Sequence, residues 1–166
     1  LLLAFWPTAP EAVGAVDIWE RPGQSLLARL YGGIPVHRGQ YDRQLLDTMQ
    51  AALLSGRPLL IAPEGGRSHQ PGMRRALPGV AYVIEKANVP VVPVGVVGAT
   101  DDFLGRALRG HRPQIEMRIG APFRLPAVSG AGEARRESRQ HNVDLIMLRI
   151  AELLPPEYRG VYANEA

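Results

Sequence analysis

The sequence of 166 residues contains no cysteine and only one lysine, Lys86. Without cysteine, disulfide-stabilised scaffolds, thiolate zinc sites and cysteine nucleophiles are excluded. Aromatic residues make up only 6% of the chain. No apolar run reaches the roughly 18 residues that a membrane-spanning helix requires, so residues 1–166 predict no such helix.

What the chain has in excess is arginine, which supplies all but one of its 19 basic residues and leaves a formal net charge of +3. Arginine recognises planar anions through its fork of donors, although many of these residues are expected simply to cover the surface. Hydrophobic residues make up 46% and charged residues 21%, an ordinary globular mixture. The length fits one domain, and we expect a single domain over residues 1–166.

Local patterns alternate between strand and helix along the chain. Strand patterns lie at residues 12–18, 34–36, 58–62, 89–97 and 114–119. Helix patterns lie at residues 25–31, 42–56, 78–87 and 143–154, whereas the polar stretch 127–140 indicates a loop. Short connections between alternating strands and helices are typical of βαβ units. The sequence therefore predicts an α/β fold with a mixed, largely parallel sheet flanked by helices.

Charged side chains follow two of the predicted strands. Arg38 comes shortly after the strand at 34–36, and Glu64 and Arg67 follow the strand at 58–62. If these strands are parallel neighbours, the three side chains converge on one edge of the sheet, where α/β proteins bind their ligands.

The connection at residues 63–77 is longer than most loops between a strand and a helix, which favours a binding role. Gly65 and Gly66 let the backbone approach a ligand closely, while Arg67 and Ser68 supply a guanidinium and a hydroxyl. Arginines beside exposed amides suit a phosphate. The alternative is a glycine turn stabilised by a salt bridge between Glu64 and Arg67.

Histidine is the side chain that most often acts as a general base. His37 and Asp42 have an H-x-x-x-x-D spacing (HRGQYD), which in principle pairs a base with an orienting carboxylate. Aspartate is also a preferred N-cap residue, and a helix pattern begins directly after Asp42. We therefore expect Asp42 to cap that helix and His37 to be a partly exposed loop residue. No pair among the four histidines has the spacing of metal ligands.

Several other classes of site lack their motifs. The chain has no phosphate-binding P-loop, no G-x-G-x-x-G fingerprint and no G-x-S-x-G elbow. The basic residues Arg135, Arg136 and Arg139 have no interleaved aromatic residues, so a solvated face is favoured over a nucleic-acid surface.

Three blocks of residues, in order, resemble the glycerolipid acyltransferases typified by 1-acyl-sn-glycerol-3-phosphate acyltransferase. Residues 32–39 (GGIPVHRG) are similar to the family's second block and residues 63–68 (PEGGRS) to its third, with glycine in place of threonine at Gly66. Residues 89–94 (VPVVPV) are similar to the fourth block. The resemblance covers most of the chain, including the tail at 153–162, and implies a glycerol-3-phosphate acyltransferase-like fold.

The resemblance implies an enzyme of phospholipid biosynthesis that transfers an acyl group to a lysophospholipid hydroxyl, converting 1-acylglycerol-3-phosphate to phosphatidic acid. The acyl donor is acyl-CoA or an acyl carrier protein, and neither a cofactor nor a metal is expected. The resemblance implies that six residues bind the phosphate and glycerol of the acceptor. They are Arg38, Glu64, Gly65, Gly66, Arg67 and Ser68. Pro90 and Pro93 match the block near the acyl chain, although prolines also shape strand ends.

The family's first block is itself an H-x-x-x-x-D pair, in which the histidine takes the acceptor's proton and the aspartate orients the imidazole. That block lies ahead of the second one and is absent from residues 1–166. His37 falls inside the second block, so we expect its match with Asp42 to be coincidental, and the catalytic residues stay unassigned. The sequence is then an acyltransferase domain missing its N-terminal portion, inactive or nearly so on its own.

Lipid substrates imply contact with the cytoplasmic face of a membrane, either peripheral or through an N-terminal anchor ahead of Leu1. Two alternatives stay open. One is a non-catalytic module that binds phosphate or lipid headgroups with the same arginines, and the other is an enzyme built on His37 and Asp42. An H-x-x-x-x-D block upstream of Leu1 would favour the acyltransferase over the binding module.

Overall fold

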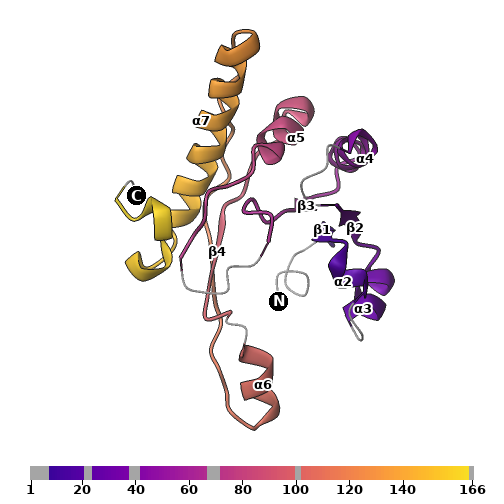
Figure 1. Ribbon diagram of the computed structural model, residues 1–166, viewed down its shortest axis with the longest axis vertical. Coiled ribbons are helices and arrows are strands. Elements are labelled where there is room, and N and C mark those ends of the chain that lie inside the picture. Colours follow the sequence, from indigo (N-terminus) through magenta and orange to yellow (C-terminus); the bar gives the residue numbers. More distant parts are fainter. Residues whose placement is uncertain (1–7, 21–23, 38–41, 67–71, 100–101, 165–166) are drawn as a thin grey trace.

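Figure 1 shows the computed structural model, which describes residues 8–20, 24–37, 42–66, 72–99 and 102–164. The strands are β1 (Glu11–Ala15), β2 (Ile34–Val36), β3 (Leu59–Leu60), β4 (Val94–Val97) and β5 (Glu116–Ile119). The helices are α2 (Asp17–Glu20), α3 (Gln24–Tyr31), α4 (Arg43–Leu54), α5 (Gly79–Ala87), α6 (Phe103–Leu108) and α7 (Gly132–Ala151). Two 3-10 turns follow, η1 (Pro156–Tyr158) and η2 (Gly160–Tyr162). The predicted α/β class is confirmed.

The strands divide into a parallel and an antiparallel sheet. The parallel sheet has the order β2-β1-β3, with Val13 opposite Ile34 in one pair and Glu11 opposite Leu59 in the other. The antiparallel sheet pairs β4 with β5. Since β1 lies between β2 and β3, these two strands are not neighbours. Both run parallel to β1, however, so their carboxyl ends still lie at the same edge.

Four of the five predicted strands are shorter in the structure. The patterns at 89–97 and 114–119 give strands only from Val94 and from Glu116. The pattern at 12–18 gives a strand only as far as Ala15, because the chain turns into α2 and the Trp19 amide donates to the Val16 carbonyl at 2.9 Å. This turn brings the Trp19 ring back over Gly14 and Gly33, where a Cβ atom would lie within 3.3 Å of the ring. The pattern at 58–62 contracts to the two residues of β3.

The prediction of a loop at 127–140 is wrong over its second half, because α7 begins at Gly132. Small and polar residues favoured a loop there, yet the stretch from Glu133 to Gln140 contains several good helix formers. Side chains at helical spacing also stabilise a helix, as where the Gln140 amide donates to the Asp144 carboxylate at 3.0 Å. The helix α6 matched no element of the sequence prediction.

The main hydrophobic core lies between α5, α7 and the C-terminal turns. Its buried residues are Met73, Ala76, Ala81, Val143, Met147, Ala151, Leu154 and Tyr162. The apolar positions of α5 and of the second half of α7 follow the helical period that the sequence predicted. Asn88 ends α5 in the left-handed conformation, with φ of 48°, directly after the predicted range of 78–87.

The C-terminal tail is joined to the end of the long loop through the backbone of Met73. The Met73 amide donates to the Tyr158 carbonyl at 3.0 Å, and the Val161 amide donates to the Met73 carbonyl at 3.1 Å. Gly160 allows this approach, because its φ is 53° and a Cβ there would lie 2.2 Å from the Met73 oxygen. The tail therefore holds the far end of the 63–77 loop in place.

A cluster of charged side chains joins α5 to the exposed first half of α7. The Glu85 carboxylate accepts hydrogen bonds from Arg135 at 2.6 Å and from Arg139 at 2.7 Å, and its side chain is only 15% exposed. Burial alone would raise the pKa of Glu85. The hydrogen bonds and charges of Arg139 and Arg135 outweigh this effect and hold the pKa of Glu85 below its usual value.

A pH-dependent stability test follows from this cluster. Because the pKa of Glu85 is lowered on folding, its contribution is fully present above the unfolded value of about 4.3 and is lost as the pH falls through the folded value. Glu85→Gln, which resembles the protonated acid, should lower the free energy of unfolding by about 1–2 kcal/mol near neutral pH. Urea unfolding at neutral pH and at a pH well below about 4 should show a smaller loss at the lower pH.

The matched control is Glu152→Gln, which removes an exposed carboxylate paired with Arg149 at 3.2 Å. Its effect should stay within about 0.5 kcal/mol at either pH. An equal loss for the Glu85 variant at both pH values would contradict the ionic role of the cluster.

Candidate functional site

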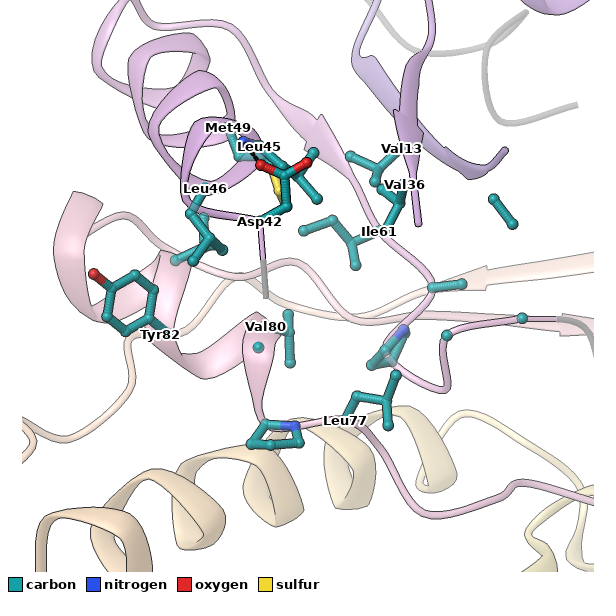
Figure 2. A pocket seen from close by; sticks show the side chains of 18 of the residues that line it. Val13, Val36, Asp42, Leu45, Leu46, Met49, Ile61, Leu77, Val80 and Tyr82 are labelled. Carbon is teal, nitrogen blue, oxygen red and sulfur yellow. Dashed lines mark hydrogen bonds between the residues drawn. The ribbon is translucent and has the colours of Figure 1, made fainter. Parts of the chain in front are cut away.

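A cavity of about 1130 Å³ lies between the parallel sheet, α4, α5 and the first half of α7. Figure 2 shows apolar side chains from several elements that point toward a common space. They are Val13, Val36, Leu45, Leu46, Met49, Ile61, Leu77 and Val80. The volume slightly exceeds the usual range for small-molecule sites, which leaves room for a long apolar ligand.

The periodicity of each element explains why these side chains share the space. In α4, positions 45, 46 and 49 fall on one helical face. In the sheet, Val13 and Ala15 lie on one face of β1, and Val36 is the direct partner of Ala15. All three sheet residues line the cavity, so this face of the sheet forms one of its walls.

This wall is unusual for a parallel sheet, because parallel sheets normally have both faces covered by helices. Val13, Val36 and Ile61 are only half-buried, and they line the cavity. Within the described ranges, then, the sheet has an apolar face that is partly open to the cavity. An apolar ligand bound there would remove that surface from water.

The glycine pair of the predicted phosphate loop lies at the edge of this cavity. Gly65 and Gly66 both line it. Gly65 has a φ of 71°, and a Cβ there would lie 2.6 Å from Leu77 Cδ1, so this backbone conformation strongly favours glycine. The Leu77 amide donates to the Pro63 carbonyl at 2.9 Å and thereby closes the base of the loop.

Of the other predicted binding residues, the structure describes only Glu64. Glu64 is 19% exposed, is not one of the cavity-lining residues, and forms an ion pair with Arg74 at 3.3 Å. Arg38, Arg67 and Ser68 lie outside the described residues, so neither their convergence nor the alternative Glu64–Arg67 salt bridge is tested. The sequence analysis did not predict that Arg74 pairs with Glu64, although both residues belong to the same long loop.

His37 and Asp42 both line the cavity, but the structure supports the interpretation of Asp42 as a helix cap. The Asp42 Oδ1 atom accepts a hydrogen bond from the Leu45 amide at 3.0 Å, and the Asp42 backbone is extended, as an N-cap requires. His37 is exposed. Within the described residues no hydrogen bond joins the two side chains, which is the contact that a base and its orienting carboxylate would make.

Pro90 and Pro93 lie apart from the cavity lining and contribute to the antiparallel sheet region. Pro93 is buried, its carbonyl accepts from the Gly120 amide at 2.9 Å, and its ring lies beside the Gly120 backbone. Pro90 is exposed and precedes the isolated bridge between Val91 and Phe123. These contacts fit the strand-shaping role, and the acyl-chain role stays a prediction.

The sequence prediction missed one wall of the cavity, which comes from the first half of α7. Glu133, Arg136, Glu137, Arg139 and Gln140 line this side. Arg139 also lies over the ring of Tyr82, another lining residue, at 5.1 Å from its centre. The spacing of charges in this segment is the signal that would have indicated an exposed helix.

Membrane-spanning helices and metal clusters are both missing from the described part of the chain. None of its helices has both the length and the apolar character that crossing a bilayer would require. No three histidine, aspartate or glutamate side chains within it are grouped as metal ligands would be.

The chain belongs to the Acyltransferase family, whose model matches residues 1–97. This span includes the sheet wall of the cavity, α4, α5 and the Gly65–Gly66 loop. A comparison with curated proteins gives no significant match.

Among solved structures, the chain is similar to the 1-acyl-sn-glycerophosphate (LPA) acyltransferase PlsC from Thermotoga maritima, with a TM-score of 0.56 and 19% identity. The alignment covers 88% of this chain and 58% of that protein, so the chain spans less than two thirds of the neighbour's length. At this level of identity the likeness establishes a shared fold and supports the fold expected from the motif blocks.

The capping role of Asp42 gives a direct stability test. Asp42→Ala removes the acceptor for the Leu45 amide and should lower the free energy of unfolding by about 1 kcal/mol. Asp42→Asn keeps a side-chain acceptor and should stay close to the original stability. Denaturant unfolding measures both, and equal losses for the two variants would show that the charge of Asp42, rather than its cap, stabilises the fold.

Proposed function

We propose that the chain forms the lipid-binding part of an acyltransferase that esterifies the free hydroxyl of a lysophospholipid, with 1-acylglycerol-3-phosphate as the acceptor. The acyl donor is a thioester, either acyl-CoA or an acyl carrier protein. Membership of the Acyltransferase family supports the reaction class. We place the enzyme at the cytoplasmic face of a membrane, where such lipids are found.

The observation that carries this proposal is an apolar cavity next to a glycine loop. Lysophospholipids and acyl donors both combine a long hydrocarbon chain with a polar end. The cavity offers half-buried valine, leucine and isoleucine side chains and the buried Met49 over a volume of about 1130 Å³. Gly65 and Gly66 lie at its edge, so the backbone there is accessible to the polar end of a ligand whose chain occupies the cavity.

The acceptor's phosphate and glycerol are assigned to the residues around this loop. Arg38 and Arg67 supply guanidinium groups, and Ser68 adds a hydroxyl that can donate a hydrogen bond. The paired carboxylate of Glu64 sits at the base of the same loop. We expect Glu64 and Arg74 to set the shape and charge of the loop, because their ion pair joins its two ends.

The proposed reaction replaces a thioester with an oxygen ester. The acceptor's hydroxyl oxygen attacks the thioester carbonyl carbon, the carbon–sulfur bond breaks, and the thiol leaves with the proton that the hydroxyl lost. A general base must take that proton during the attack. We assign this role to the H-x-x-x-x-D block that the family places ahead of its second block, and not to His37.

Arg67→Ala tests the phosphate assignment in the full-length protein. Loss of a charged hydrogen-bond donor should raise KM for 1-acylglycerol-3-phosphate about 10- to 100-fold while KM for the acyl donor changes little. Steady-state transfer of a labelled acyl group from acyl-CoA measures both constants. Arg75→Ala is the matched control, because Arg75 is exposed, belongs to the same loop and does not line the cavity.

An unchanged KM for the acceptor in the Arg67 variant would contradict the assignment. A full-length protein that binds the lysophospholipid but forms no acylated product from either donor would instead identify the non-catalytic binding module. Robust acyl transfer that His37→Ala abolishes would restore the enzyme built on His37 and Asp42.

A further inference from the structure

The connection between β4 and β5 carries α6 away from the rest of the molecule. Figure 1 shows α6 at the end of the molecule opposite the first half of α7. None of its described residues lines the cavity, and the helix packs against no other described element to any substantial extent. We call β4, α6, β5 and their described connections, residues 94–99 and 102–119, the arm.

The tip of the arm has a concentrated positive charge. Residues 103–112 contain three arginines, Arg106, Arg109 and Arg112, and no acidic residue. All three are exposed, and none forms an ion pair with another described residue. Several arginines elsewhere are matched by carboxylates, as Arg118 is by Glu116 at 2.7 Å within the arm itself. The tip therefore presents positive charge to its surroundings.

Apolar side chains accompany this charge. Leu108, between two of the arginines, is 80% exposed. Along the arm, Val94 pairs with Ile119 and Val96 with Met117. Because a Cβ on the intervening Gly95 would lie 2.9 Å from Leu154, the Gly95 face points toward the end of α7, and these two pairs occupy the opposite face.

That opposite face is incompletely covered by the described chain. Ile119 is 51% exposed and Val96 is 37% exposed. The arm thus combines an apolar face, an exposed leucine and three arginines that have no acidic partner among the described residues. Basic side chains next to apolar ones are the combination that binds the interface of an anionic bilayer, with the charges at the headgroups and the apolar groups between them.

We infer that the arm is a membrane-docking element that binds an anionic phospholipid surface. Nucleic acid is disfavoured, because residues 103–112 contain one aromatic side chain, Phe103, and it is only half-exposed. An acidic carrier protein must bring its thioester to the cavity, whereas α6 lies away from it. Docking by the arm does not depend on acyl transfer, so it can be tested without substrate.

Vesicle sedimentation tests the charge. The full-length protein is mixed with vesicles of phosphatidylcholine containing phosphatidylglycerol, and with vesicles of phosphatidylcholine alone. Each arginine near an anionic surface contributes about fivefold to binding, so changing Arg106, Arg109 and Arg112 to Gln should weaken binding on the order of 100-fold. The matched control makes the same change at three exposed arginines outside the arm, Arg43, Arg75 and Arg149. It should weaken vesicle binding far less than the change at the tip.

Insertion of the tip is tested separately, because the sequence of 166 residues has no native cysteine to interfere with labelling. Leu108→Cys, labelled with a polarity-sensitive dye, should show a blue-shifted and brighter emission on anionic vesicles. Leu54→Cys is the control, since Leu54 is 65% exposed at the end of α4, far from the tip. Its emission should not change.

Three results would overturn the inference. The first is an equal loss of vesicle binding for the two triple variants. The second is an unchanged emission spectrum of the dye at position 108 when the protein is bound to vesicles. The third is a specific loss of binding to an acidic carrier protein in the Arg106, Arg109 and Arg112 variant while vesicle binding is retained. None of these results would affect the proposed reaction, which is measured by product formation with detergent-dispersed lipid.

Discussion

The open apolar face of the parallel sheet is the constraint on which the rest of the site depends. A parallel sheet needs apolar cover on both faces, yet Val13, Val36 and Ile61 face a cavity instead of a packed helix. The walls that complete this cavity come from α4 and α5, which contact each other, and from α7, which packs against α5. The fold therefore holds apolar surface in an accessible place, which costs stability unless a ligand or another part of a protein covers it.

The glycine loop connects that apolar space to polar chemistry. Gly65 adopts a left-handed conformation that favours glycine, and a Cβ there would lie 2.6 Å from Leu77 Cδ1. The Leu77–Pro63 hydrogen bond closes one end of the loop, and the C-terminal tail fixes the region of Met73 beyond it. Glu64 and Arg74 then pair across the loop. These contacts join the ends of the loop, and a loop held in this way has less freedom to lose when its backbone amides bind a charged group.

Much of the fold was predictable from local patterns, and the exceptions have physical causes. The helix after Asp42 and the helix at 78–87 were predicted correctly, because both have apolar residues at helical spacing and Asp42 is a capping residue. The strand at 12–18 was overestimated, because the β-branched Val16 and Ile18 obscured a turn that lets Trp19 cover the sheet. The first half of α7 was missed because its small and polar residues favoured a loop, although its charge spacing is typical of an exposed helix. Its hydrogen bonds to Glu85 on another helix are contacts that local sequence does not reveal.

The candidate site was predicted only in part for a related reason. The motif blocks located Gly65 and Gly66 at the cavity, but motifs identify loops and not the walls opposite them. The contribution of Arg139 and Tyr82 depends on α5 and α7 meeting in three dimensions. The pairing of Glu64 with Arg74 was likewise hidden, because Arg67 was the nearer arginine in sequence.

The central claim is that a hydrocarbon chain occupies the cavity beside the glycine loop. Ile61→Trp places a larger side chain on the cavity wall, and Leu54→Trp places the same side chain at an exposed site outside it. The most direct measurement is the binding of lysophosphatidic acids of increasing chain length to both variants of the full-length protein. We expect Ile61→Trp to weaken binding of long-chain lipids by about tenfold or more, while short-chain lipids and the Leu54 variant are little affected. Equal affinity of both variants for long-chain lipids would contradict the claim.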